Sequence, residues 1–292
     1  MEEKIEEERI MEKRYLEVWH RLCKNKIAIL GLVILSIFIF LAVFADVIAD
    51  YDTKVIAQDV TSRLQPPSKE HWFGTDGYGR DIFARIIHGT RITLFIAFTT
   101  TAISAVAGGI LGMAAGFYGG VIDNVIMRIV DTVMCLPPLL FSLSIVAALG
   151  TGMRNLIIAV SFTMTPYFAR VIRATAISVV SMDYIEASKS LGSSNIKTII
   201  WHVLPNSIGP IIVQATMNLS YMIMLSAGLS FIGLGIQPPA PEWGAMLSEG
   251  REFMRYSPYI VAFPGLAIVL TALSLNLLGD GLRDALDPKL NN

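Results

Sequence analysis

The sequence predicts an all-α integral membrane protein with six transmembrane helices. Of its 292 residues, 53% are hydrophobic and only 16% are charged, and the mean hydropathy is +0.58. A soluble chain of this length needs a surface richer in charged residues, whereas a lipid-facing surface does not. The net charge of -1 gives no sign of a nucleic-acid partner, so the expected surroundings are membrane lipid.

Six stretches with little or no charge are the predicted spans. A helix rises about 1.5 Å per residue, so about 20 apolar residues cross the hydrocarbon core of a bilayer. The first run lacks the small-residue cleavage site of a signal peptide, so we expect it to be retained. The predicted spans are residues 27–45, 92–120, 129–150, 156–169, 207–241 and 259–278.

The distribution of basic residues predicts that both termini are cytoplasmic. With the N-terminus inside, fourteen of the 23 Lys and Arg residues fall in cytoplasmic segments and nine fall in longer outer segments. The resulting segments are a cytoplasmic tail and amphipathic helix (1–26), the first transmembrane helix (27–49), an extracytoplasmic loop (50–91), a five-helix core (92–280) and a cytoplasmic C-terminal tail (281–292).

An interfacial helix is predicted before the first span. Apolar residues recur there at helical spacing, and basic residues follow at the membrane boundary. The alternative is a solvated charged tail, which we expect for residues 2–8. The residues of the predicted apolar face are Met11, Tyr15, Val18, Trp19 and Leu22.

Small residues and prolines mark the second and third spans. Ser104, Gly108, Gly112 and Gly116 fall every four residues, which is typical of a face where two membrane helices approach closely. The sequence leaves open whether the neighbouring helix belongs to this chain. The adjacent residues 137 and 138 are both Pro, which predicts a bend or break in the third span.

No catalytic or metal-binding pattern is found. The phosphate-binding G-x-x-x-x-G-K-[ST] loop is missing, and the four His residues (20, 71, 88 and 202) show no ligand spacing. The two Cys residues, 23 and 135, are far apart, so neither a disulfide nor a metal site is expected. Arg128 and Asp131, three residues apart near the cytoplasmic end of the third span, are expected to pair with each other.

A polar, amphipathic two-helix unit is predicted at residues 181–206, on the cytoplasmic side. Ser181 is expected to cap a short helix, Gly192 to supply the left-handed turn that ends it, and Pro205 to stop a second helix that begins near Ser194. This unit is expected to be either a docking knob or an ordinary interfacial loop. One face of the first helix carries Tyr184, Ala187, Ser188 and Leu191, with Glu186 beside it.

The outer segment from residue 71 to residue 91 carries too many charges to lie in lipid. We expect it to be a solvated loop, or else a surface that receives another protein or shapes the outer mouth of a pathway. Its candidate residues are Gly74, Thr75, Asp76, Gly79, Arg80 and Asp81.

Four stretches carry a resemblance to a known family. The sequence "EASKSLGSSNIKTIIWHVLP" resembles the EAA motif of ATP-binding cassette importer permeases, and Ser188 stands for the third small residue of that motif. "HWFGTDGYGRDIFARIIHGTR", "LSFIGLGIQPPAPEWGAML" and "LLGDGLRDALDPK" resemble the C-type permease subunit of dipeptide, oligopeptide and nickel importers. The positions that match the EAA motif are Glu186, Ala187, Gly192, Leu204 and Pro205.

The resemblance implies a transport subunit rather than an enzyme, located in the cell membrane of a prokaryote. It implies a second homologous permease, an extracytoplasmic substrate-binding protein and two ATPase subunits that bind ATP and Mg, with no cofactor in this chain. The EAA loop would then be the coupling helix seated on an ATPase. Many relatives have an acidic residue where this chain has Ser226. Peptides are favoured over nickel as the substrate because no His or Cys cluster faces a path for a metal ion. The alternative functions are a stand-alone secondary transporter and a membrane scaffold.

Overall fold

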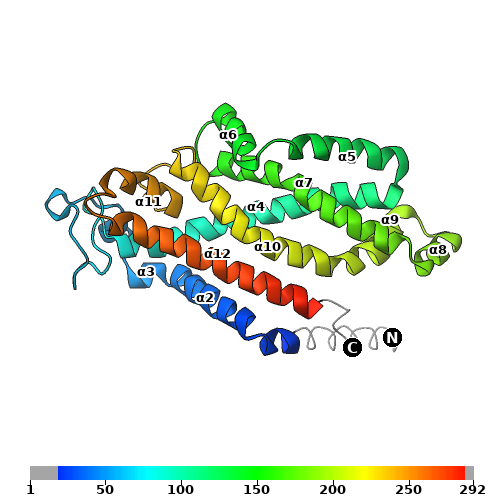
Figure 1. Cartoon of the computed structure of the whole chain (residues 1–292), viewed down its shortest axis with the longest axis horizontal. Coiled ribbons are helices and arrows are strands. Elements are labelled where there is room, and N and C mark those ends of the chain that lie inside the picture. The colour runs from blue at the N-terminus through cyan, green and yellow to red at the C-terminus, as the bar shows by residue number, and fades with distance from the viewer. Residues whose placement is uncertain (1–18, 287–292) are drawn as a thin grey trace.

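The computed structural model describes residues 19–286, and Figure 1 shows them as a bundle of long helices. In this part of the chain five helices are long and apolar enough to cross a membrane, and one bent helix pair brings the number to six. The predicted all-α membrane fold is confirmed. The helices concerned are α2 (Lys26–Val43), α4 (Ile82–Tyr118), the pair α5 (Gly120–Met134) and α6 (Pro138–Leu149), α7 (Met153–Val180), α10 (Leu204–Phe231) and α12 (Tyr259–Leu286).

Short elements lie at the two ends of this bundle. At one end are α8 (Asp183–Ser190), α9 (Asn195–Thr198) and the π-helical turn η3 (Ile199–Val203). At the opposite end Figure 1 shows α11 (Trp243–Gly250) beside the loop that precedes α4. The remaining short elements are α3 (Ala45–Ile48), η1 (Tyr51–Ile56), η2 (Val60–Ser62) and η4 (Arg251–Phe253).

Most of the predicted interfacial helix lies outside the described residues, including Met11, Tyr15 and Val18. Residues 19–24 are helical and lead into α2. Leu22 is buried in a small apolar cluster with Ala28 of α2 and Ala285 of α12. The start of the described chain is therefore held against the last helix of the bundle.

Helix α4 begins at Ile82, earlier than the predicted residue 92, because its charged first turns are neutralised within the protein. Asp81 caps the helix by accepting a hydrogen bond from the N–H of Ala84 at 2.8 Å. Arg91 forms an ion pair with Asp46 at 2.8 Å. These turns carry charged residues, so they lie outside the uncharged run that predicted a start at residue 92, although their charges are paired in the folded chain.

The third predicted span is broken, as its two prolines predict. Helices α5 and α6 meet at an angle of 90°. Pro138 stands in the first turn of α6, where a missing backbone N–H costs no helical hydrogen bond. The break makes α5 and α6 a bent pair along the outside of α7 (Figure 1).

Helix α7 continues to Val180, well past the predicted end at residue 169. Its two arginines are paired with aspartates of α5: Arg170 with Asp131 at 2.6 Å, and Arg173 with Asp123 at 2.5 Å. The predicted pairing of Arg128 with Asp131 is therefore wrong. Packing of α5 along α7 brings the long arginine side chains of the neighbouring helix to both carboxylates.

The small-residue stripe of α4 packs against α7 of the same chain, and this is the most extensive helix contact in the bundle. A Cβ atom on Gly108 would lie 2.5 Å from the Cβ of Phe168, and one on Gly112 would collide with the carbonyl oxygen of Ala169. Ser104 donates a hydrogen bond to the carbonyl of Ser161 at 3.0 Å. These contacts answer the question that the sequence leaves open about the neighbouring helix.

Pro205 does not stop the helix that starts after Ser194, so this expectation is wrong. The elements α9, η3 and α10 form one helix from Asn195 to Phe231. In η3 the N–H of Leu204 donates to the carbonyl of Ile199, the i to i−5 bond of a π-helical turn. Such a turn rearranges the backbone hydrogen bonds just before Pro205, so that the helix continues past a residue without an N–H.

Candidate functional site

The loop at the α8 end is anchored from within and exposed at its tip. Ile185 of α8 is buried in the main apolar core with Val179 and Val203. Thr198 is buried and donates a hydrogen bond to the carbonyl of Ser194 at 3.2 Å. These inward-facing residues fix the position of α8. Lys189 also lies over the ring of Phe117, with its Nζ atom 4.5 Å from the ring centre, whereas most other side chains of α8 are exposed.

The turn after α8 has the geometry predicted for Gly192. Its φ is +83°, in the left-handed region that favours glycine. The N–H of Gly192 donates to the carbonyl of Lys189 at 3.0 Å, and the N–H of Ser193 donates to that of Ser188 at 3.2 Å. This pair of hydrogen bonds is a Schellman motif, which closes the helix and sets the direction of the following chain.

The start of α8 differs from the prediction. The residue before the helix is Met182, and no side chain caps its first N–H groups. Ser181 is turned toward α7, where its hydroxyl donates to the carbonyl of Ser178 at 2.9 Å. The predicted Ser181 cap is wrong because α7 runs on almost to the start of α8, which places this serine in the last turn of α7.

Around the turn, the loop presents side chains that touch little of this chain. Leu191 is 89% exposed, and Tyr184, Glu186 and Ala187 are also exposed. Ser188 is half-buried, and Leu204 and Pro205 are exposed at the start of α10. Large exposed apolar groups are costly in water unless lipid or another protein covers them. Nearby exposed apolar side chains are Ile196, Ile200 and Trp201.

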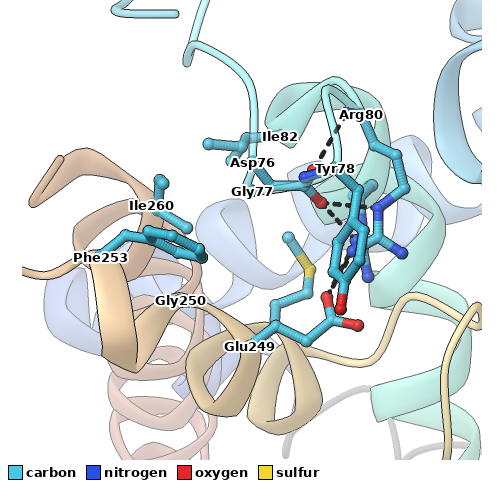
Figure 2. A pocket seen from close by; sticks show the side chains of 11 residues that line it. Asp76, Gly77, Tyr78, Arg80, Ile82, Glu249, Gly250, Phe253 and Ile260 are labelled. Carbon is cyan, nitrogen blue, oxygen red and sulfur yellow. Dashed lines mark hydrogen bonds and ion pairs between the residues drawn. The ribbon is translucent and has the colours of Figure 1, made fainter. Parts of the chain in front are cut away.

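A buried cluster of four charged residues lies at the opposite end of the bundle (Figure 2). Asp76 Oδ2 accepts hydrogen bonds from Arg80 Nε at 2.7 Å and from Arg85 Nη1 at 2.5 Å. Glu249 Oε2 lies 2.7 Å from Arg80 Nη2 and 3.0 Å from Arg85 Nη1. We call Asp76, Arg80, Arg85 and Glu249 the outer charge cluster, after the predicted outer segment 71–91 to which the first three belong.

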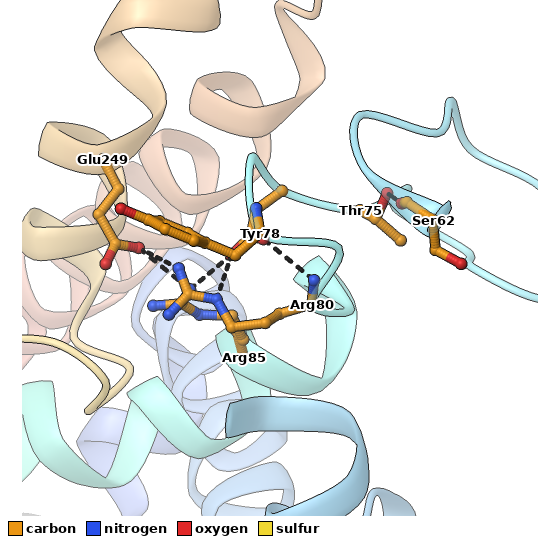
Figure 3. Close-up of polar contacts among 7 residues, drawn as sticks. Ser62, Thr75, Tyr78, Arg80, Arg85 and Glu249 are labelled. Carbon is orange, nitrogen blue, oxygen red and sulfur yellow. Dashed lines mark hydrogen bonds and ion pairs between the residues drawn. The ribbon is translucent and has the colours of Figure 1, made fainter. Parts of the chain in front are cut away.

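The outer charge cluster joins three parts of the chain. Asp76 and Arg80 belong to the loop, Arg85 to α4 and Glu249 to α11 (Figure 3). The ring of Tyr78 covers the guanidinium of Arg80, whose carbon lies 4.6 Å from the ring centre. Two positive and two negative groups balance each other, so the cluster can be buried without an uncompensated charge.

Burial of the cluster corrects the expectation of a charged docking surface. Arg80 is 2% exposed, Arg85 is 1% exposed, and Asp81 is buried at the start of α4. The charges therefore face inward, and neither a solvated loop nor a contact with another protein describes Arg80 and Asp81. They position the loop against α4 and α11, and a surface for another protein would have to use other residues.

The glycine and threonine of the outer motif hold the loop in a tight fold. Gly79 has a φ of +79°, and a Cβ there would collide with the backbone of Asp59. Gly74 has the same φ and lies against the carbonyl of Gln65. Thr75 donates a hydrogen bond to the carbonyl of Ser62 at 2.5 Å (Figure 3).

Two carboxylates at this end of the bundle were not among the predicted site residues. Glu249 completes the outer charge cluster, although it lies 169 residues after Arg80. Glu242 is fully buried at the start of α11, where it accepts hydrogen bonds from the N–H groups of Gly244 and Ala245 at 3.0 and 2.8 Å. Burial raises the pKa of the Glu242 carboxyl in spite of these two hydrogen bonds.

Two further residue types from the sequence analysis are placed by the structure. Ser226 is buried in α10 and donates to the carbonyl of Ile223 at 3.1 Å. Cys23 and Cys135 are both exposed and unpaired. Among residues 19–286, no three His, Cys, Asp or Glu side chains are grouped closely enough to hold a metal ion.

Comparison with known proteins gives consistent relatives over most of the chain. Residues 108–292 match the family "binding-protein-dependent transport system inner membrane component", and residues 15–67 match the N-terminal transmembrane domain of oligopeptide transport permease C. The dipeptide transport system permease protein DppC of Alkalihalophilus pseudofirmus is 45% identical, with 94% of this chain and 90% of that protein covered. The di/tripeptide permease DppC of Pseudomonas aeruginosa is 41% identical, with 94% and 92% covered.

A solved structure supports the same fold. A chain of the MetNI methionine ABC transporter, in an inward-facing conformation, superimposes with a TM-score of 0.56 and 17% identity, with 69% of this chain and 96% of that chain covered. The matched fold, the family match over residues 108–292 and the relatives above 40% identity agree with one another. The chain therefore belongs to the family of inner membrane components of binding-protein-dependent transport systems.

Proposed function

We propose that this chain is a permease subunit of an ATP-binding cassette importer of peptides and forms half of the translocation pathway. Its relatives include permeases named for dipeptides, for di- and tripeptides and, in Escherichia coli at 43% identity, for glutathione, which is itself a small peptide. The partners in this proposal are a second homologous permease, two ATPases that bind ATP and Mg, and an extracytoplasmic substrate-binding protein. Both termini are cytoplasmic in this proposal.

The exposed loop around α8 supports the proposed coupling to the ATPases. Its buried residues, such as Ile185, connect it to the main core, so a displacement of α8 acts on α7 and α10. Its exposed residues Ala187 and Leu191 have no packing role in this chain. An element that is rigidly attached on one side and uncovered on the other suits transmission of a partner's movement to the helices.

The transport proposal is tested by uptake measurements in cells that lack the chain. Labelled dipeptides, longer peptides and nickel are supplied separately, with and without a plasmid that restores the chain. We expect restored uptake of peptides and no change in nickel uptake. Nickel uptake that depends on the chain would assign the other substrate of this family, and dependence of neither would contradict an import role.

The coupling proposal is tested by enlarging Ala187 to Trp. Because Ala187 is exposed, the substitution leaves the packing of this chain unchanged and obstructs only a partner seated on α8. We expect normal membrane abundance, but either loss of co-purification with the ATPases or retention of them without ATP-driven uptake. Ala148→Trp is the matched control, because Ala148 is also exposed and belongs to α6 rather than to the loop.

A second variant tests the direction of the loop. Gly192→Val places a β-branched residue at a φ of +83°, which costs about 1–2 kcal/mol and displaces the turn. Gly209→Ala is the control, because Gly209 also has open space around it but has an ordinary helical φ. Glu186→Ala should be milder, since an exposed ion pair contributes about 0–1 kcal/mol. Wild-type uptake by Ala187→Trp at equal abundance would show that this loop is not the coupling element.

A further inference from the structure

Several polar side chains belong to the membrane-spanning segments of two neighbouring helices, α7 and α10. Gln214, Asn218 and Tyr221 follow one another at positions i, i+4 and i+7 of α10, so they share one face of that helix. Tyr167 belongs to α7, which packs against α10. Both tyrosines lie several helical turns from the ends of their helices, Met153–Val180 and Leu204–Phe231, and so inside the spanning segments. We call these four residues the mid-membrane polar strip.

The hydrogen-bonding groups of this strip are largely unused within the described chain. The Nδ2 atom of Asn218 is buried without a partner. The structure gives no hydrogen bond to the side chains of Gln214, Tyr221 or Tyr167 within residues 19–286. Other polar groups of these helices are satisfied locally: Thr216 donates to the carbonyl of Ile212, and Ser220 bonds to Asn276.

Lipid is an unfavourable neighbour for this face. Tyrosine is enriched where a membrane meets water, and an amide or hydroxyl in hydrocarbon without a partner costs several kcal/mol. Tyr221 is nevertheless 42% exposed in the isolated chain. The strip must therefore be covered by another protein or face a hydrated passage.

The composition of the same face favours a passage for varied peptides. Met224, one turn beyond Tyr221, is largely exposed, and flexible methionines are typical of surfaces that accept differently shaped ligands. Helix contacts in membranes instead favour small residues, as in the stripe that joins α4 to α7. Amides and hydroxyls can bind the N–H and C=O groups that every peptide has, whatever its side chains.

We infer that Tyr167, Gln214, Asn218 and Tyr221 line the translocation passage and bind the backbone of the peptide during transfer. This inference rests on the proposed function and adds the residues that contact the substrate. The strip would replace the water that a peptide amide loses inside the membrane. Because the interactions are with the backbone, the strip would not select particular side chains.

Cysteine accessibility tests whether the strip is hydrated. In a background with Cys23→Ser and Cys135→Ser, single variants Gln214→Cys, Asn218→Cys and Tyr221→Cys are assembled into the complete transporter. A positively charged methanethiosulfonate reagent reacts only with thiols in water. Ile212→Cys is the control, since Ile212 is equally exposed on α10 but lies on the opposite side of the helix from Tyr221. We expect at least two strip positions to react and Ile212→Cys to remain inert.

Transport kinetics test whether the strip acts on the substrate. Loss of one hydrogen bond with the peptide in Asn218→Leu or Tyr221→Phe should lower the maximal uptake rate about 2- to 12-fold. The apparent KM should stay unchanged, because the separate binding protein captures the peptide first. Ile212→Leu should leave both quantities unchanged.

Three outcomes would overturn the inference. Strip cysteines as inert as Ile212→Cys, disulfide cross-links from them to the second permease, or full uptake by Asn218→Leu and Tyr221→Phe would each place these residues outside the passage. In those cases the wild-type chain would still restore peptide uptake, so the proposed function would stand. Failure of the wild-type chain to support peptide uptake would instead contradict the proposed function itself.

Discussion

The outer charge cluster allows a prediction based on charge balance. Removing Glu249 with Glu249→Gln leaves two arginines with only Asp76, and removing Arg85 with Arg85→Met leaves two carboxylates with only Arg80. Each single variant buries an unbalanced charge. The double variant keeps the balanced pair of Arg80 and Asp76 at 2.7 Å. We therefore expect the double variant to be more stable than either single variant.

The structure sets the scale of these effects. Breaking a buried ion pair by removing one partner costs about 3–5 kcal/mol, whereas replacing both partners by less polar groups is often nearly neutral. Glu249 is 16% exposed and can keep part of its hydration, so Glu249→Gln should lie at the lower end of that range. The cost of Arg85→Met should lie at the upper end of that range, because Asp76 and Glu249, which both contact Arg85 Nη1, then repel each other more strongly.

The wild-type chain and the three variants form a double-mutant cycle, which is measured by thermal unfolding of the purified complex and by abundance in the membrane. Both single variants should lower the midpoint, and the double variant should recover most of the loss. Glu252→Gln is the control, because Glu252 is an exposed carboxylate close to Glu249. If the losses of the single variants simply add in the double variant, the charge-balance reasoning is refuted.

Three further predictions concern helix packing, pH and orientation. Gly112→Ala should destabilise the contact of α4 with α7, which is measured as a lower unfolding midpoint. Gly109→Ala is the control, because its Cβ would meet only a side-chain methyl at 3.6 Å, and equal effects of the two variants would contradict the packing of α4 on α7. Because the folded pKa of Glu242 is raised, its contribution to stability is fully present below its unfolded pKa and is lost as pH rises through the folded pKa. Glu242→Gln should therefore weaken the fall of the unfolding midpoint as pH rises above the ordinary range of a Glu carboxyl, and an unchanged slope would count against this. A cysteine at Ser68 should react with an impermeant reagent outside intact cells and one at Ser193 should not; the reverse pattern would invert the proposed orientation.

Several features of the fold follow from the sequence because they depend on local rules. Lipid requires about 20 apolar residues in a row for each crossing helix, so hydropathy predicts the spans without knowledge of their neighbours. The prolines at residues 137 and 138 lack backbone N–H groups, so they predict the break between α5 and α6. Gly192 predicts the left-handed turn after α8 for a similarly local reason.

The ends of helices and the partners of charges are decided by tertiary structure. Charged residues led to predicted starts and ends inside α4 and α7, because the sequence does not show that Arg91 is paired with Asp46 or Arg170 with Asp131. The π-helical turn before Pro205 likewise lets a helix continue where the local rule predicts a stop.

The candidate sites show the same division. The residues of the loop around α8 and the charges before α4 can be read from the sequence, because both are continuous stretches. Burial of these charges depends on the fold, since their partner Glu249 comes from α11, 169 residues after Arg80. The packing of α7 against α10, which brings Tyr167 to the helix that carries Gln214, Asn218 and Tyr221, is likewise a tertiary feature. Periodicity shows which residues share a face of one helix, but which faces meet depends on how all the helices pack together.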